Sequence, residues 1–123
     1  MHVEKKNIVL EKSFQLGLKI IRLTTELSKK NRVLADQILR SGTSVGANLN
    51  EAQAALTKKE FIAKVSIAAK EIRETKYWLM LLTESKLVER DTELEELVDE
   101  IIRIITKIIK SSQEANSTLN TNN

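Results

Sequence analysis

Few residues of this 123-residue chain are of a type that performs catalysis or binds a metal ion. Cysteine is absent, which excludes thiol nucleophiles, disulfides and thiolate metal sites. The one histidine, His2, lies at the N-terminus, where side chains are usually solvated. Glu71 and Glu74 lie about one helical turn apart, a spacing found in di-iron bundles, but those sites also need Glu-x-x-His motifs, which this sequence lacks. We therefore predict neither a metal centre nor an enzyme.

The segment Gly42 to Gly46 carries two glycines but does not have the pattern of a phosphate-binding loop. It continues a helical pattern, and it lacks the preceding strand and the lysine that a P-loop requires. Two glycines four residues apart favour a close approach between two helices instead. We predict no cofactor.

Residues 35–55 carry an apolar stripe and, beside it, a stripe of small and polar residues. The apolar stripe follows coiled-coil spacing and consists of Ile38, Gly42, Val45, Leu49, Ala52 and Leu56. The polar seam has the same spacing and consists of Gln37, Ser41, Ser44, Asn48, Glu51 and Ala55. A bundle helix needs the first stripe to form a core, so the polar seam requires a separate explanation.

The next predicted helix also carries two stripes. Its apolar stripe follows heptad spacing and consists of Phe61, Val65, Ala68, Ile72, Thr75, Leu79 and Leu82. The stripe beside it mixes charged and bulky residues and consists of Lys64, Ile67, Glu71, Glu74 and Trp78.

Two interpretations of the polar seam remain open. In the structural one, Ser41, Ser44 and Asn48 hydrogen-bond to the following helix and fix its register. The candidate partners there are Lys64, Glu71 and Glu74. In the functional one, a recognition surface or the lining of an oligomeric pore is formed by Arg40, Ser44, Asn48 and Glu51.

The elements that position these residues are predicted to be helices. The sequence has no proline, three glycines and 3% aromatic residues, which favours an all-α protein. We expect helices over about 8–30, 32–56, 58–84 and 92–113, with a bundle domain over 1–115 and a disordered polar tail over 116–123. The predicted caps are Asn31 and two capping boxes, Thr57 with Glu60 and Thr92 with Glu95. Short connections then give an up-down-up-down four-helix bundle.

Two of these helices have more apolar surface than one core can bury. The first has one apolar face with Phe14, Leu18 and Ile21 and a second, roughly opposite, with Leu16, Ile20, Leu23 and Leu27. The apolar arc of the fourth helix, over residues 94–109, covers roughly 160°, against the ~100° that a single core needs. We therefore predict a homo-oligomer, in which a second copy covers the excess apolar surface.

The charge distribution suggests an alternative function. Residues 1–32 hold eight Lys/Arg against three Asp/Glu, whereas residues 84–123 hold five against nine. Basic clusters at the bundle ends could bind RNA or DNA phosphates with a steep salt dependence. One cluster contains Lys29, Lys30, Arg32 and Arg40, and the other contains Lys5, Lys6, Lys58 and Lys59. No aromatic residues alternate with these cations to stack bases.

No signal peptide and no apolar run long enough to span a membrane is apparent. With cysteine absent, a cytoplasmic location is the expectation.

Two blocks of the sequence resemble a known family. The first, QILRSGTSVGANLNEA over residues 37–52, is similar to the signature of the 23S rRNA intervening sequence proteins. The second covers KKEFIAK, IAAKEIRET and YWL within residues 58–79 and resembles the next block of that family's pattern. Many members have glycine where Ala52 stands here, so no feature tied to that glycine is carried over.

The resemblance implies a left-handed four-helix bundle that assembles into a ring-like pentamer. The resemblance implies no established enzymatic activity. It implies a bacterial protein whose cellular role is unresolved. A similar bundle, the accessory protein of diversity-generating retroelements, works with a reverse transcriptase and binds nucleic acid, which is an analogy at the level of the fold. A non-catalytic scaffold or adaptor is the leading hypothesis for this chain, and a nucleic-acid-binding module is the alternative.

Overall fold

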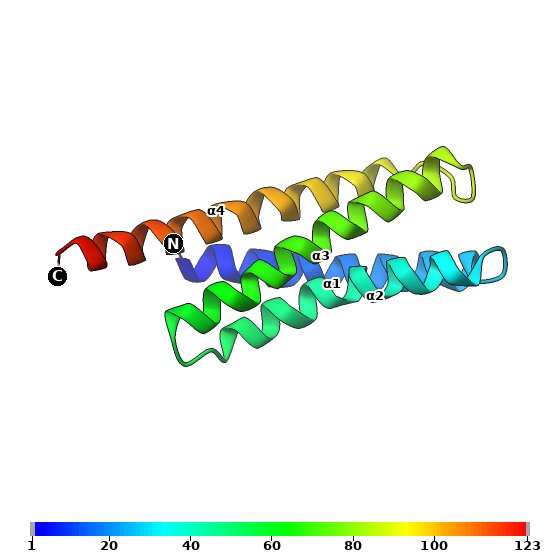
Figure 1. Ribbon diagram of the computed structural model, residues 1–123. Helices are drawn as coiled ribbons and strands as arrows, with labels where there is room; N and C mark the ends of the chain where they lie inside the picture. Colours follow the sequence, from blue (N-terminus) through cyan, green and yellow to red (C-terminus); the bar gives the residue numbers. More distant parts are fainter. Residues whose placement is uncertain (1, 123) are drawn as a thin grey trace.

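The computed structural model describes the backbone of residues 2–122 and the side chains of residues 8–115. This part forms α1 (His2–Leu27), α2 (Arg32–Gln53), α3 (Lys58–Glu84) and α4 (Thr92–Asn122), and it contains no β-strand (Figure 1). The prediction of an all-α protein with four helices is confirmed. The predicted ends of the first and second helices were each three residues too late, and α4 runs past the predicted end near residue 113. The predicted disordered tail, residues 116–123, lies outside the described side chains and stays a prediction.

Two of the three predicted caps are confirmed. The Asn31 side chain accepts a hydrogen bond from the backbone N–H of Leu34 (3.0 Å) and so begins α2. Thr57 accepts from the N–H of Glu60 (3.0 Å), and the Glu60 carboxylate reaches back to the N–H of Leu56 (2.8 Å). Because the α2–α3 connection is only residues 54–57, these two helices are neighbours in space.

The predicted capping box of the fourth helix was wrong by one residue. Asp91, not Thr92, is the cap, and its carboxylate accepts from the N–H of Leu94 at 3.0 Å. Glu95 instead accepts two hydrogen bonds from Arg90, at 3.1 and 2.9 Å. An aspartate precedes the threonine, and its charge at a helix N-terminus adds a favourable interaction with the helix dipole.

Helices that follow one another in the chain pack side by side, and α4 also packs against α1 to close the bundle. In the described part no Cα atom of α1 lies within 8 Å of one of α3, and none of α2 lies within 8 Å of one of α4, so each of these pairs is diagonal. Figure 1 shows α4 continuing beyond the end of the bundle at which the α2–α3 connection lies. None of the described helices carries an apolar stretch long enough to cross a membrane.

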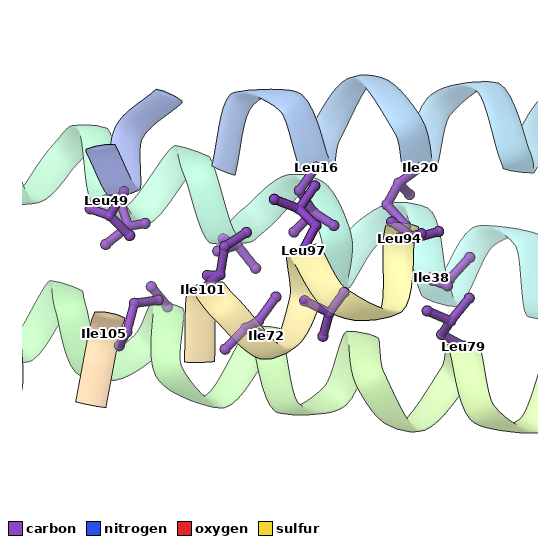
Figure 2. Packing of buried hydrophobic residues seen from close by; sticks show 14 of the residues in the cluster. Leu16, Ile20, Ile38, Leu49, Ile72, Leu79, Leu94, Leu97, Ile101 and Ile105 are labelled. Carbon is purple, nitrogen blue, oxygen red and sulfur yellow. The ribbon is translucent and has the colours of Figure 1, made fainter. Parts of the chain in front are cut away.

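The core lies along the bundle axis and takes side chains from all four helices (Figure 2). The predicted stripes of α2 and α3 supply much of it, and its largest fully buried side chains include Leu16, Ile20, Ile38, Leu49, Ile72, Leu82, Leu94, Ile101 and Ile105. Leu56, which the stripe pattern placed in this core, is 93% exposed because α2 ends before it.

The two glycines of α2 lie where α1 crosses it. A Cβ atom on Gly42 would lie 2.8 Å from Cγ1 of Ile20, a fully buried side chain, and a Cβ on Gly46 would lie 3.4 Å from Oγ of Ser13. The expectation that these glycines allow a close helix approach agrees with this geometry.

Candidate functional site

The predicted polar seam of α2 faces α3, and the two charged residues of the predicted recognition surface, Arg40 and Glu51, lie in separate groups. Arg40 contacts Glu71 and Glu74 of α3, whereas Glu51 accepts a hydrogen bond from Lys64 at 2.8 Å. Arg40 and Glu51 are eleven residues apart, which along a helix is about 16 Å. The four predicted recognition residues therefore do not converge on one point.

Arg40 is the centre of the larger group. Its Nη1 donates to Oε2 of Glu71 at 3.1 Å, and its Nη2 donates to Oε2 of Glu74. The indole N–H of Trp78, one turn further along α3, donates to the same Glu74 oxygen at 2.9 Å. Two carboxylates on one guanidinium leave this group with an excess negative charge, and its hydrogen bonds tie α2 to α3.

These contacts shift the ionisation of two side chains. The pKa of Glu74 is lowered by the hydrogen bond from Trp78 and, to a smaller extent, by the hydrogen bond and charge of Arg40. Partial burial opposes this shift. The hydrogen bond that Arg40 donates to Glu74 raises the pKa of Arg40. Both shifts favour the charged pair in the folded protein.

Replacing Glu74 with glutamine should lower the free energy of unfolding near neutral pH and leave it unchanged in acid. A carboxylate whose pKa is lower in the folded state stabilises that state above its unfolded pKa, and the stabilisation disappears as the pH falls through the folded value. Because half of the Arg40 side chain is exposed, we expect a difference of no more than about 1 kcal/mol. Chemical denaturation of wild type and Glu74→Gln between neutral pH and pH of about 3 measures it.

Trp78→Phe is the second variant for this test, because it removes the indole donor and keeps an aromatic ring. It should give a smaller loss with the same pH dependence. A difference between wild type and Glu74→Gln that stays constant over the whole pH range would contradict the assignment.

The uncharged members of the seam behave differently from one another. Ser41 is fully buried, and its hydroxyl oxygen lies 3.0 Å from that of Thr75 on α3, which also donates to the Glu71 carbonyl at 2.8 Å. The Asn48 amide donates to the Ser44 carbonyl of its own helix at 2.8 Å. The hydrogen bond across to α3 that the structural interpretation assigns to this seam is therefore present at Ser41, whereas the Asn48 amide bonds within α2.

Two members of these groups, Thr75 and Trp78, are not among the predicted site residues. The heptad spacing puts Thr75 in the apolar stripe of its helix, and Trp78 counts there only as a bulky residue beside that stripe. The spacing of four residues between Glu74 and Trp78 is a signal that could have paired them.

The predicted phosphate-binding residues also fall into two environments. Lys29 lies 3.5 Å from Glu26, and the Lys30 ammonium lies 3.5 Å from the carbonyl of Leu87 in the α3–α4 connection. Arg32 is exposed at the same end and forms no ion pair within the described side chains. Of the four cations predicted to bind phosphate at this end, Lys29 and Arg40 form ion pairs, whereas Lys30 and Arg32 form none among the described side chains.

At the other end, Lys58 and Lys59 are exposed and have no ion pair among the described side chains. Lys5 and Lys6 lie outside the residues whose side chains the structure describes. Among the described side chains, the charged residues Arg40, Glu51, Lys64, Glu71 and Glu74 of the α2–α3 seam pair with one another.

Comparisons with known proteins agree with this fold. A family model described as 23S rRNA-intervening sequence protein matches residues 5–110. The chain is also similar to a solved structure from Bacteroides thetaiotaomicron, described as a protein with unknown function from the S23 ribosomal protein family. The two sequences are 39% identical, the match covers 86% of this chain and 98% of the other, and the TM-score is 0.81. No protein with a curated description matches the chain.

Proposed function

The chain belongs to the 23S rRNA-intervening sequence protein family, and we propose that it is a non-catalytic scaffold or adaptor that works as a homo-oligomer. The assembly we propose is a ring of five up-down-up-down, left-handed bundles, the number and arrangement that the family resemblance implies. The observation that carries the proposal is an uncovered apolar face on α1.

This face of α1, which we call the α1 face, consists of Phe14, Leu18 and Ile21. Their side chains are 67%, 40% and 48% exposed, and they recur at steps of four and three residues. Single exposed apolar residues are ordinary, but a continuous row of three along a helix is typical of an interface.

The surroundings of the α1 face support close packing by another chain. Gly17 lies in the middle of α1, and a Cβ there would have no neighbour within 4 Å, so the fold of the single chain does not require this glycine. Glycine within a helix costs about 1 kcal/mol relative to alanine. The close approach of a second copy would explain why glycine occupies this position of α1. By helical phase, the adjacent outward positions of α2 are all uncharged: Leu39, Thr43, Ala47 and Asn50.

A second exposed apolar patch lies on α3 and contains Tyr77, Met80 and Leu81. Since α1 and α3 are diagonal in the bundle, the two patches lie on different sides of the molecule. A symmetric dimer through the α1 face would leave the α3 patch exposed, whereas head-to-tail contacts can cover both and close into a ring. The wide apolar arc of α4 supports oligomerisation less, because its isoleucines are buried or half-buried within the single chain.

Multi-angle light scattering on the purified chain tests the proposal directly. We expect a single species several times heavier than the 14.0 kDa chain at micromolar concentration. A stable monomer under these conditions would overturn the proposal.

The second candidate function is nucleic-acid binding, and one feature of the surface favours it. Seven exposed cations of α3 and α4 form no ion pair among the described side chains: Lys58, Lys59, Lys70, Arg73, Arg103, Lys107 and Lys110. The ion pair between Lys76 and Asp99 (2.8 Å) marks the level at which α3 and α4 lie side by side. All seven cations lie between this level and the end of the bundle that carries the α2–α3 connection. The binding surface would then lie along α3 and α4 towards the α2–α3 connection.

For this second candidate, we expect a labelled single-stranded RNA to bind at low salt and to dissociate as salt is raised. The slope of log K against log salt should be about −0.7 for each phosphate contact. Arg73→Glu with Arg103→Glu should abolish most of the binding, and Arg32→Glu, at the opposite end of the bundle, should not. Absence of RNA binding at low salt would remove this candidate.

A further inference from the structure

An open groove lies at the end of the bundle where α2 is joined to α3. It has a volume of about 530 Å³, and its lining comes from the α2–α3 connection with its flanking helix ends and from the C-terminal part of α4. Ala52, Phe61 and Ile108 supply apolar lining, and Leu56, Lys58 and Lys107 border it.

The groove exists because the helices have unequal lengths. α2 ends at Gln53 and α3 begins at Lys58, whereas α4 continues beyond this end of the bundle (Figure 1). The apolar side of α4 here therefore faces the α2–α3 connection rather than a full-length helix. Ser111 and Ser112 also line the groove, so it offers hydroxyl groups beside the apolar surface.

Leu56 is the most exposed large apolar residue of the described part, at 93%. Its position is held by the cap of α3, because its backbone N–H donates to the Glu60 carboxylate at 2.8 Å. An aliphatic side chain fixed at the border of an apolar groove suits a partner that presents apolar side chains of its own.

The border of the groove is basic. Lys58 and Lys107 lie on different helices and have no ion pair among the described side chains, and Lys59 and Lys110 are exposed next to them. Of the neighbouring carboxylates, Glu51 is paired with Lys64, Glu60 accepts from Leu56, and Glu114 is exposed on α4. The four lysines outnumber these three carboxylates, so the border carries a net positive charge and attracts a negatively charged partner.

We propose that this groove binds an acidic segment of a partner protein, with Leu, Ile or Phe side chains against the apolar lining and Asp or Glu side chains beside Lys58 and Lys107. The proposal rests on the adaptor function and names the chemistry of the client. Charge alone would also fit nucleic acid, but the aliphatic Leu56 and Ile108 give bases no stacking surface, whereas they complement apolar side chains.

Arrays of short peptides in which acidic residues flank Leu, Ile or Phe test the proposal against the full-length protein. Two matched arrays replace either the acidic residues with lysine or the apolar residues with serine. We expect peptides of the first array alone to bind, and we expect the best of them, in fluorescence anisotropy, to lose affinity about tenfold or more in Leu56→Ser and in Lys58→Glu with Lys107→Glu. Lys58→Glu should not unfold α3, because a negative charge is favourable in the first turn of a helix.

The matched control variants lie at the opposite end of the bundle. Val33→Ser removes another exposed apolar side chain and Arg32→Glu reverses another unpaired cation, and neither should change peptide affinity. The proposal is overturned if no acidic peptide binds. It is also overturned if affinity depends on Lys58 and Lys107 but not on Leu56 while single-stranded RNA competes, since that result assigns the lysines to phosphates.

Light scattering on the same samples separates this proposal from the oligomeric scaffold. A monomer that still binds the acidic peptides would overturn the scaffold and retain the groove. An oligomer that binds none of the acidic peptides would overturn the groove proposal and retain the oligomeric scaffold.

Discussion

Replacing Gly42 with valine is expected to destabilise the bundle by about 3 kcal/mol, at the upper end of what overpacking a core costs. The first added carbon would already lie 2.8 Å from Cγ1 and 3.0 Å from Cγ2 of Ile20, and Ile20 is fully buried. Since both atoms branch directly from the Ile20 Cβ, they cannot move aside without shifting α1 from α2. The measurement is the denaturant midpoint, or a fall in Tm of roughly 10 °C.

Gly42→Ala tests the same contact with a smaller change. Alanine gains about 1 kcal/mol of helix propensity, which partly offsets the collision, so this variant should be less destabilised than Gly42→Val. Ala63→Val, an exposed position of α3, controls for the presence of a β-branched residue in a helix and should cost about 0.5 kcal/mol. Equal losses of unfolding free energy in Gly42→Val and Ala63→Val would show that the close approach of α1 to α2 does not restrict the size of the side chain at residue 42.

Replacing Phe14 and Ile21 with glutamate should convert the oligomer to a monomer. An interface that covers the α1 face would gain about 1.5–3 kcal/mol from each large apolar side chain, and it would have to desolvate each new carboxylate. We therefore expect the association constant to fall by at least about 100-fold, equivalent to about 2.8 kcal/mol. Light scattering over a concentration series measures the loss.

The control for this prediction is the neighbouring residue. Gln15→Glu adds the same carboxylate to the same helix turn, but Gln15 lies on the polar side of α1, so this variant should assemble as wild type does. Phe14→Glu alone should weaken assembly while leaving helix content unchanged, because Phe14 is 67% exposed in the single chain and contributes little to its core. If Phe14→Glu and Gln15→Glu assemble equally well, the α1 face is not the interface.

Where the sequence analysis was accurate, a local signal decided the structure. Asn31 and Thr57 were identified as caps because a cap bonds to an N–H only three residues away. The stripe of α3 was identified because heptad spacing keeps residues such as Val65, Ile72 and Leu79 on one side of a helix whatever that helix packs against.

Where it was wrong or incomplete, the outcome depended on neighbours distant in the chain. Leu56 continued the spacing of the α2 stripe, but the chain leaves the helix before reaching it. The wide apolar arc of α4 appeared to exceed what one core could bury, yet the neighbouring helices at least partly cover its isoleucines. The exposed patch of Tyr77, Met80 and Leu81 was not predicted, because only the packing of α3 shows which of its apolar residues face outward.

The sequence by itself determined that this chain forms four long helices, which residues of each helix share a face, and that α1 has two apolar faces. These properties follow from the period of the α-helix, the absence of proline and capping bonds a few residues long, all of which act locally. Only the tertiary structure decided that Arg40 holds Glu71 and Glu74, that Ile20 rests on Gly42, and that Lys58 and Lys107 border one groove. Those contacts depend on the distance and stagger between helices, which side-chain packing across the whole core sets at once.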